Sequence, residues 1–587
     1  MAKNNEELYK MAKVVVGIDF GTSGTGYAYA YSFNDQNDII LGNFPGQGVD
    51  VKVPTEIIID SKFEKILSFG VNCKEYYEQN QLKNGELYFK AIKMNLYHKV
   101  YEITPQNSTQ NYKIVDIIAK ILEYVKGIVI KRVNDGYPDI TENQIKWVVT
   151  VPSIWDYSQR EIMILASEKV GLFNEFTNKL NFLALEAEAA SLYCSQDNSV
   201  DSKYLGNGKS YILCDLGGGT GDIVTHKIDN NLEIKEISPP DGGDYGSDEI
   251  DKKIYDIVIY KIFGFKDFND LKKKNKEIGS PFEEDILFKE WMAFLEEIQA
   301  KKKITKNSEN KTFYLNCQLF EKFIDNNKLQ DLIDEYNKSV PKDWEINLKN
   351  GLWLTIPYKI FFDLINEHAK MISNKLINIY KDNPNIESII FVGGYSSNEI
   401  LINSIKNNIN FENVVFLLPS RPFVAVVKGA VLFGLKPEII KVRKAPYTIG
   451  FNADHQWDER IHGGKGEKFY NEVLKIYQCK NSFDKFIQIG QDISNGQKIK
   501  RIFSAKNSRY IYLKFFKTKK ANPLLYTEEN VEPLGQATID LEKEYPINER
   551  NFEVTLEIGG TYIVAKCVHC ISKKEINIKL YFNEEKK

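Results

Sequence analysis

The chain has 587 residues, of which 43% are hydrophobic and 27% charged, a composition typical of a soluble globular protein. At ~150 residues per domain, the length predicts roughly four domain-sized units. Lys and Arg (77) nearly balance Asp and Glu (80), which argues against a nucleic-acid-binding protein, because such proteins normally carry a clustered basic excess. Seven cysteines are too few for a disulfide scaffold and favour a reducing compartment.

Neither a secretory leader nor a membrane-spanning segment is expected. The first nine residues are polar and charged, and the first apolar run, residues 14–16, is soon followed by Asp19, so it is too short for the apolar region of a leader. The most apolar later stretch, residues 422–435, contains Lys428 and falls short of the ~18 uninterrupted apolar residues of a transmembrane helix. We therefore expect a cytoplasmic protein.

The first part of the chain alternates between strand and helix patterns. In chain order, these patterns predict strands at 13–18 and 27–33, a helix at 114–133, a strand at 144–151 and a helix at 159–170 that Gly171 ends. Strands are then predicted at 210–216 and 223–227, charged helices between 248 and 303, a strand at 388–392 and a helix from residue 399 onward. Alternation over this length predicts an α/β architecture.

The pattern changes after about residue 435. Pro437, the basic run 441–444 and Pro446 predict a linker. Short alternating strands separated by turn residues then follow, at 486–489, 510–516, 537–541, 552–558, 562–568 and 575–582. This spacing is typical of an all-β module, here of ~140 residues.

Two glycine-rich turns that follow strands carry the main functional signal. They are GIDFGTSGTG at 17–26 and CDLGGGTGD at 214–222. Glycine lets the backbone approach a ligand, and its N–H groups cradle phosphate oxygens together with Thr and Ser hydroxyls. Asp19 and Asp215 are suited to hold hydrated Mg²⁺ through its water ligands. Each turn alone also fits a plain hairpin with a surface Asp; two facing each other would hold a nucleotide's phosphates, and the glycine pair 393–394 could pass under its adenosine.

Several further segments, taken in order, resemble the 70-kDa heat-shock proteins, chaperones of the actin-like ATPase superfamily. The segment VTVPSIWDYSQR at 149–160 is similar to their strand, Pro, aromatic residue and Ser-Gln-Arg helix start. The other segments similar to that family are EAEAA at 186–190, GGDYGSD at 242–248 and the run from Pro422 to Ala430. SFG at 68–70 and YFKAIKM at 88–94 look most like the divergent 12-type branch.

This resemblance implies an α/β fold: an actin-like, two-lobed ATPase domain with duplicated ribonuclease-H-like lobes, followed by an all-β sandwich resembling a peptide-binding domain. The domains it predicts are ATPase lobe I at 13–205, ATPase lobe II at 206–436 with a helix at 420–436 that returns to lobe I, a linker at 437–445, and a β-rich, substrate-binding-like domain at 446–587. Because the chain ends soon after the strand-like run 575–582, we expect this last domain to lack a helical lid.

The resemblance also implies roles for individual residues. The catalytic residues it implies are Asp19, Lys93, Glu186, Asp215 and Thr220. Asp19 and Asp215 would orient the waters around Mg²⁺, and Thr220 would lie nearest the γ-phosphate. Phosphoryl transfer needs positioning and charge neutralisation more than a strong base, which suits this set of residues.

Two of these assignments have neighbouring alternatives. Lys93 would stabilise the transferring phosphoryl group, but Lys90 lies one helical turn away. Glu186 would help to place the attacking water, but Glu188 competes for that role. Ala187 stands where the family has Pro.

A wider set of residues is implied for contacts with ATP or ADP. The predicted nucleotide-binding residues are Gly21, Thr22, Ser23, Gly217, Gly218, Gly219, Gly242, Gly243, Lys301, Lys302, Gly393, Gly394 and Tyr395. Lys301 and Lys302 would contact ribose and adenine, although a run of lysines also fits a solvated helix face. Ser397 stands where the chaperones usually carry the basic residue that stacks on adenine.

We therefore expect an ATP-binding and ATP-hydrolysing, chaperone-like protein whose nucleotide state controls lobe closure. Its β domain would bind unfolded or extended peptide segments or a dedicated protein client, with co-chaperones as further partners. The alternative is a nucleotide-gated adaptor or signalling protein with little ATPase turnover that binds one dedicated partner. A small-molecule kinase of the same superfamily is disfavoured, because no obvious acceptor-binding Asp motif lies between the two phosphate turns.

Overall fold

The computed structural model describes residues 12–33, 38–48, 50–80, 82, 85–174, 176–177, 182–229, 233–279, 282–302, 308–472, 474–559 and 562–578. The polar N-terminus, Lys303 at the end of the predicted helical stretch and residues 579–582 of the last predicted strand lie outside this description. No helix within the described ranges combines the length and apolar character that crossing a membrane requires.

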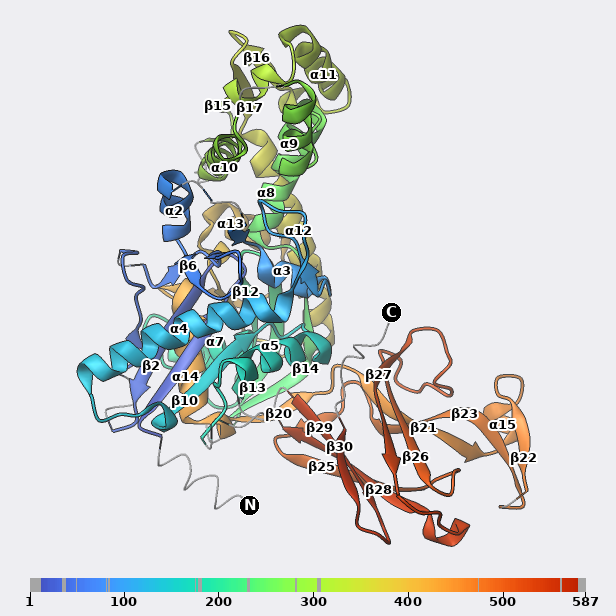
Figure 1. The fold of residues 1–587 in the computed structure, drawn as a ribbon. Coiled ribbons are helices and arrows are strands. Elements are labelled where there is room, and N and C mark those ends of the chain that lie inside the picture. The colour runs from blue at the N-terminus through green and yellow to red at the C-terminus, as the bar shows by residue number, and fades with distance from the viewer. Residues whose placement is uncertain are drawn as a thin grey trace.

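A mixed sheet forms the centre of the N-terminal part of the chain (Figure 1). Its strands are β1 (Val14–Phe20), β2 (Thr25–Tyr31), β3 (Ile40–Leu41), β4 (Lys52–Val53), β10 (Ile145–Val151) and β11 (Leu183–Leu185). The strand order is β11-β10-β1-β2-β3, and β4 also pairs with β2. β1 runs parallel to β10 and antiparallel to β2. Every residue of β1 and β10 is buried, as expected of strands covered on both faces.

A second sheet repeats this arrangement. Its strands are β12 (Ser210–Leu216), β13 (Gly221–Ile228), β14 (Ile234–Gly243), β18 (Ser388–Val392), β19 (Val415–Leu417), β20 (Ile440–Lys444) and β24 (Asp492–Ser494). The order is β19-β18-β12-β13-β14-β20-β24. The first five strands have the same order and directions as in the first sheet. A repeated sheet of this kind is the structural sign of a duplicated α/β unit.

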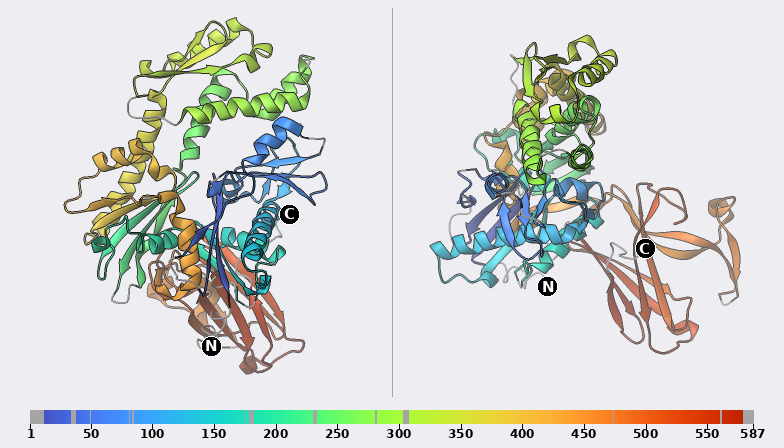
Figure 2. Two further views of the ribbon diagram at one scale, coloured as in Figure 1. Left: turned by 90° about the vertical axis from the view of Figure 1, so that its left-hand side faces the viewer. Right: turned by 45° about the horizontal axis from the view of Figure 1, so that its top comes forward.

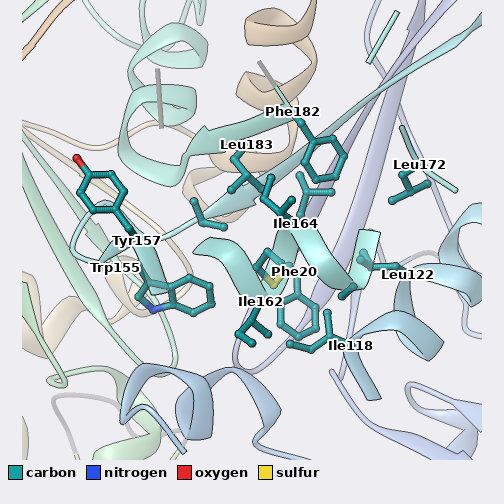
Figure 3. Packing of buried hydrophobic residues seen from close by; sticks show 14 of the residues in the cluster. Phe20, Ile118, Leu122, Trp155, Tyr157, Ile162, Ile164, Leu172, Phe182 and Leu183 are labelled. Carbon is teal, nitrogen blue, oxygen red and sulfur yellow. The ribbon is translucent and has the colours of Figure 1, made fainter. Parts of the chain in front are cut away.

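Helices cover both sheets. They include α4 (Ile114–Gly136), α5 (Tyr157–Lys169), α7 (Glu186–Cys194) and α14 (Ala425–Leu435). α4 and α5 confirm the helices predicted at 114–133 and 159–170. Figure 3 shows Ile118 of α4 and Ile162 of α5 close to Phe20 at the end of β1, within one apolar cluster. α5 begins at Asp156, whose carboxylate accepts the N–H groups of Ser158 and Gln159, so the sequence motif supplies the helix cap.

Two of these helices lie between the sheets (Figure 2, left). α14 packs on α7 and on strands β1, β2 and β10. The two helices cross so closely that a Cβ on Gly429 would lie 1.7 Å from the carbonyl oxygen of Ala189. Glycine at this position therefore permits the crossing. Ala187 and Ala190 of α7 join the apolar cluster of the second sheet. The pair therefore connects the two sheets at their centre.

A mostly helical region follows the second sheet's first three strands and lies at the top of Figure 1. Its elements are α8 (Ser247–Tyr255), a π-helix (Asp256–Ile262), α9 (Phe268–Glu277), α10 (Glu284–Lys301), α11 (Asn326–Lys338), α12 (Lys359–Asp382) and the sheet of β15 (Thr312–Asn316), β16 (Asn347–Lys349) and β17 (Trp353–Pro357). Across from it, α2 (Asn72–Asn80) of the N-terminal part contacts α10, because the Tyr77 hydroxyl donates to Glu296 at 2.6 Å. These elements meet on one side of the space between the sheets.

The C-terminal region consists of two antiparallel sheets. Their strands are β21 (Thr448–Gln456), β22 (Lys468–Asn471), β23 (Ile476–Ile487), β26 (Tyr510–Thr518) and β27 (Val531–Asp540) in one, and β25 (Gln497–Ser504), β28 (Asn551–Gly559), β29 (Tyr562–His569) and β30 (Glu575–Ile578) in the other. The ring of Phe451 packs 4.6 Å from that of Phe503 and 5.3 Å from that of Phe515, measured between centroids. Aromatic rings from both sheets thus fill the space between them.

The structure differs from the sequence patterns in this region in strand number and length, because β21, β22, β24 and β25 lie outside the predicted strands. The predicted strand 486–489 overlaps only the last two residues of the twelve-residue β23. Polar residues such as Gln478 and Asp484 interrupt the apolar pattern of β23, which hid most of its length. β25 was not predicted, because most of its residues face solvent.

Residues 440–444, predicted as linker, form β20, the second strand from one edge of the second sheet. β20 pairs with β14 on one side and with β24 of the C-terminal region on the other. A second contact joins the C-terminal region to the first sheet's helices, since Lys517 lies 2.8 Å from the Asp156 carboxylate at the start of α5. The predicted domain boundaries themselves stay a prediction.

Candidate functional site

A cavity of about 130 Å³ lies where the two sheets meet. Its walls come from the turn after β1, the turn after β12, and the segments around α3 (Ile92–Tyr97), α7 and β18. The five predicted catalytic residues all line it: Asp19, Lys93, Glu186, Asp215 and Thr220. So do eight of the predicted nucleotide-binding residues: Gly21, Thr22, Ser23, Gly217, Gly218, Gly219, Gly393 and Gly394.

The two glycine-rich turns face each other across this cavity. A Cβ on Gly218 would lie 1.6 Å from the Ser23 hydroxyl, and one on Gly219 would lie 2.5 Å from the Thr22 hydroxyl. Glycine is therefore required on the second turn for the hydroxyls of the first turn to approach. Ser23 also donates a hydrogen bond to Asp248 at 2.8 Å, which links the first turn to the start of α8.

Gly393 provides the third backbone wall. Its φ of +86° lies in the left-handed region, and a Cβ there would lie 2.4 Å from the Leu216 carbonyl oxygen and 2.5 Å from the Asp215 carboxylate. A side chain at this position would both strain the backbone and displace the acid. The sharp turn after β18 thus depends on glycine.

Charged side chains gather at the floor of the cavity. The Lys93 ammonium donates to the Glu186 carboxylate in a buried ion pair. The Lys52 ammonium lies 2.5 Å from Oδ2 of Asp19. Asp222 is held by the backbone N–H of Ile154 at 3.0 Å, and Thr220 donates to it at 3.5 Å.

Acids outnumber bases in this cavity. The lining carboxylates are Asp19, Glu186, Asp215 and Asp222, and the lining cations are Lys52 and Lys93. Burial raises the pKa of Asp215, and the neighbouring Asp222 carboxylate raises it further. Burial also raises the pKa of Glu186, against the opposing effect of Lys93. The cavity is therefore short of positive charge and suited to receive a cation.

The donor set fits a hydrated divalent cation of the kind that Asp19 and Asp215 were predicted to hold. Oδ2 of Asp19 is buried and lies 2.5 Å from the Lys52 ammonium, but it accepts no hydrogen bond of regular geometry, so it can also accept a water of the metal. Mg²⁺ usually keeps several waters and binds through one or two carboxylates and substrate phosphates. Within the described ranges, no group of three or more His, Cys, Asp or Glu is arranged to coordinate an ion directly; the predicted contact is through water.

Comparison with other proteins finds relatives over nearly the full length of the chain. No family model matches the chain. Heat shock 70 kDa protein 12A of Homo sapiens is 26% identical to it over 97% of this chain and 91% of the relative. Heat shock 70 kDa protein 12B of Homo sapiens is 21% identical over the same shares. This similarity over nearly the whole chain supports the 70-kDa heat-shock-protein family and its 12-type branch. A chaperone protein HscA homolog of Rickettsia bellii is 26% identical over 45% of this chain and 41% of the relative.

This full-length similarity confirms the predicted resemblance and gives the sheets a context. The 70-kDa heat-shock family implies an actin-like ATPase lobe together with a β domain, and the mixed α/β sheets followed by an all-β region are consistent with that. Family members in general bind ATP or ADP with Mg²⁺. The cavity between the two sheets brings together most of the residues predicted for such binding.

Five predicted nucleotide-binding residues do not line the cavity, for identifiable reasons. Gly242 and Gly243 lie in β14 opposite β13, where a Cβ on Gly242 would be 2.3 Å from the Gly221 carbonyl oxygen. Lys302 pairs with Asp251 at 2.6 Å, and Lys301 precedes it at the end of α10. Their predicted contacts with a nucleotide stay predictions.

Tyr395 is the fifth of these residues. Its side chain is buried in the apolar cluster of the second sheet, and its ring lies 6.3 Å from that of His368, measured between centroids. The aromatic ring follows the general preference for the core, so Gly393 and Gly394, and not this side chain, border the cavity.

Two residues that the sequence did not single out take part in the site. Asp222 ends the second glycine-rich turn, and its position within that motif could have identified it as a further acid. Lys52 lies in a short strand without any motif, so nothing local in the sequence indicated it. The structure also distinguishes the predicted catalytic residues Lys93 and Glu186 from their sequence alternatives. Lys90 lies 3.7 Å from Glu56, Glu188 pairs with Arg443, and neither lines the cavity.

Proposed function

We propose that this protein binds ATP and ADP with Mg²⁺ in the cavity between its two sheets and hydrolyses ATP, as a chaperone-like member of its family. The observation that carries the proposal is the meeting of the two glycine-rich turns, one from each sheet, around the buried Lys93–Glu186 pair. Backbone N–H groups and hydroxyls on both walls provide the donors that phosphate oxygens need. A hydrated metal held by Asp19 and Asp215 would neutralise phosphate charge.

The chain's own residues then have distinct roles in phosphoryl transfer. Thr22 and Thr220 donate hydroxyl hydrogen bonds to phosphate oxygens, with Thr220 nearest the γ-phosphate. The Lys93 ammonium stabilises the charge that develops on the transferring group. Glu186, held against Lys93, accepts a hydrogen bond from the attacking water and orients it. With the roles assigned in this way, none of the carboxylates in the cavity has to act as a strong base.

The C-terminal β region is the proposed site for extended peptide segments or a dedicated protein client. Two observations support this. Relatives of the chain are named as chaperones, and large apolar side chains lie exposed on the arm formed by β22 and β23, including Tyr470, Leu474 and Tyr477. Contacts of this region with Asp156 at the start of α5 and with β20 would let lobe closure affect it. Co-chaperones and a cytoplasmic location complete the proposal.

A nucleotide-gated adaptor with little turnover is the second candidate. It is favoured by β20, which is built into the second sheet and fixed by a buried Arg443–Glu188 pair. A linker held in this way suits a protein in which bound nucleotide fixes one conformation and is not turned over in a hydrolysis cycle. Both candidates share nucleotide binding and differ in hydrolysis.

Phosphate release from ATP separates the two candidates. We expect slow release by the wild-type protein and a rate at least about tenfold lower for Asp215→Asn and Glu186→Ala, because each removes a group that positions or neutralises the reacting phosphate. Asp256→Asn, an exposed acid of the π-helix, is the matched control. Bound ADP without release above background would favour the adaptor, and equal rates in all variants would refute hydrolysis in this cavity. Binding of extended apolar peptides, with and without ATP, tests the β region.

A further inference from the structure

Lys52 reaches the cavity through the register of three neighbouring strands. Asp19 of β1 stands opposite Gly26 of β2, and Gly26 stands opposite Lys52 of β4. The three residues therefore form one row across the sheet. Adjacent strands lie about 4.8 Å apart, so the Lys52 backbone is two strand spacings away from Asp19, a gap that an extended lysine side chain spans.

Gly26 in the middle of the row leaves room for this side chain. A Cβ on Gly26 would lie 2.9 Å from Cγ of Lys52 and 2.8 Å from the Val51 carbonyl oxygen. The stem of Lys52 thus crosses β2 at the one position in the row that has no side chain. Its ammonium ends 2.5 Å from Oδ2 of Asp19, with a quarter of the side chain still exposed.

Neighbouring polar contacts hold the chain beside Lys52 in place. The hydroxyls of Thr25 and Thr55 lie 2.9 Å apart, and Thr55 donates to the Gly21 carbonyl oxygen at 2.7 Å. These bonds tie the segment after β4 to the first glycine-rich turn. The placement of Lys52 is therefore part of the built wall of the cavity and not that of a freely moving surface lysine.

The charge of the cavity gives this lysine a function. Lys93 is committed to Glu186, whereas Lys52 contacts Asp19, the acid that otherwise faces the waters of the metal. An ammonium is a compact charge with three donors, so it can bond Asp19 and a phosphate oxygen together. Such charge-assisted bonds are about twice as strong as neutral ones. Lys52 thus occupies the place at Asp19 where positive charge is needed when nucleotide enters.

We infer that Lys52 is a built-in cation of the phosphate site, which holds Asp19 in the absence of metal and lets the cavity bind nucleoside polyphosphates with little dependence on Mg²⁺. The inference rests on the proposed nucleotide binding and adds to it a feature of this chain's own residues. It concerns binding and not turnover, so hydrolysis can still require the metal.

The test measures binding of a fluorescent ADP analogue to the full-length protein by anisotropy, in Mg²⁺ and in excess EDTA. The quantity compared is the ratio of the two dissociation constants. For the wild type, we expect removal of Mg²⁺ to raise the constant by less than about tenfold. For Lys52→Met, we expect a ratio at least about tenfold larger than for the wild type, because no cation then remains at Asp19. Lys52→Arg keeps the charge and should stay near the wild type.

Lys90→Met is the matched control, because Lys90 has a similar exposure (22% against 25%) and lies near Glu56 outside the cavity lining. Its ratio should equal that of the wild type. Equal ratios for the wild type and Lys52→Met would overturn the inference while leaving nucleotide binding intact. If Lys52→Met does not fold, the wild type alone still tests the inference: a ratio of its two dissociation constants above about a hundredfold would overturn it. Absence of binding in either buffer would refute the proposed function itself.

Discussion

The buried pair between Arg443 and Glu188 offers the sharpest test of how the chain's parts are joined. Nε of Arg443 donates to Oε1 of Glu188 at 2.5 Å, and Nη2 donates to Oε2 at 2.7 Å. Arg443 is 11% exposed and Glu188 is 2% exposed. The pair joins β20, which lies between β14 and β24 in the second sheet, to α7 between the sheets. Replacing either residue therefore leaves an opposite charge buried without its partner.

The expected cost follows from that burial. Removing one partner of a buried ion pair destabilises a protein by about 3–5 kcal/mol, mostly through the unpaired charge, whereas replacing both with apolar residues is often neutral. We expect Arg443→Met and Glu188→Met each to lower the free energy of unfolding by about 3–5 kcal/mol. The double variant should lose much less than the sum, which gives a coupling energy of about 2 kcal/mol or more.

Urea unfolding followed by circular dichroism measures these differences, and trypsin cleavage within residues 441–444 reports whether β20 detaches. The control is Arg509→Met, which removes an equally bidentate pair, with both contacts to Asp540 at 2.8 Å, but one whose side chains are 43% and 42% exposed. Solvent screens that pair, so its loss should matter far less. An equal effect of Arg509→Met, or additive losses in the double variant, would refute the reasoning from burial.

Two further predictions concern the same junction. Burial raises the pKa of Glu236 to about 8, with the Lys444 N–H opposing this shift. Because the pKa of an unfolded Glu is about 4.3, the contribution of Glu236 to wild-type stability should fall as pH rises from about 4 to about 8. Glu236→Gln should therefore gain stability relative to the wild type between pH 5 and pH 9 in urea unfolding, and a constant difference would contradict the shift. Gly429→Ala should cost at least about 2 kcal/mol through its 1.7 Å approach to Ala189. Gly127→Ala in α4, which meets nothing within 4 Å, should instead stabilise the protein by about 0.5–1 kcal/mol; similar effects of the two substitutions in thermal unfolding would contradict the close crossing.

The cavity was largely predictable because its parts are local. Each glycine-rich turn carries its own strand, acid, glycines and hydroxyl within about ten residues, so the sequence alone indicated both walls. Their meeting follows from the repeat: when two sheets have the same strand order, equivalent turns occupy equivalent ends. The residues of these turns that were predicted to bind or act on a nucleotide, from Asp19 to Thr220, all line the cavity.

Residues placed by long-range pairing were not predictable in this way. Lys52 stands in a Val-Lys-Val run that fits any half-buried strand, and only the register of β4 on β2 brings it to Asp19. Tyr395 follows a glycine pair, a position that favoured ligand contact, but the choice between ligand and core depends on the helices packed behind it. Lys302, just after α10, likewise pairs with Asp251 of α8, and nothing in the sequence indicated that these two helices bring the residues together.

The two glutamates at the start of α7 show how helix geometry separates functions that a motif leaves mixed. Glu186 and Glu188 were alternatives for one role, yet residues two apart on an α-helix differ in direction by about 200°. Glu186 faces Lys93 in the cavity, and Glu188 faces Arg443 in β20. A buried carboxylate needs a cation. Arg443 of the predicted linker is the cation that Glu188 of α7 needs, which accounts for the basic residue in the linker and for the buried acid on the helix. An apolar linker in this chain would leave Glu188 buried and uncompensated, so the linker and the helix have to change together.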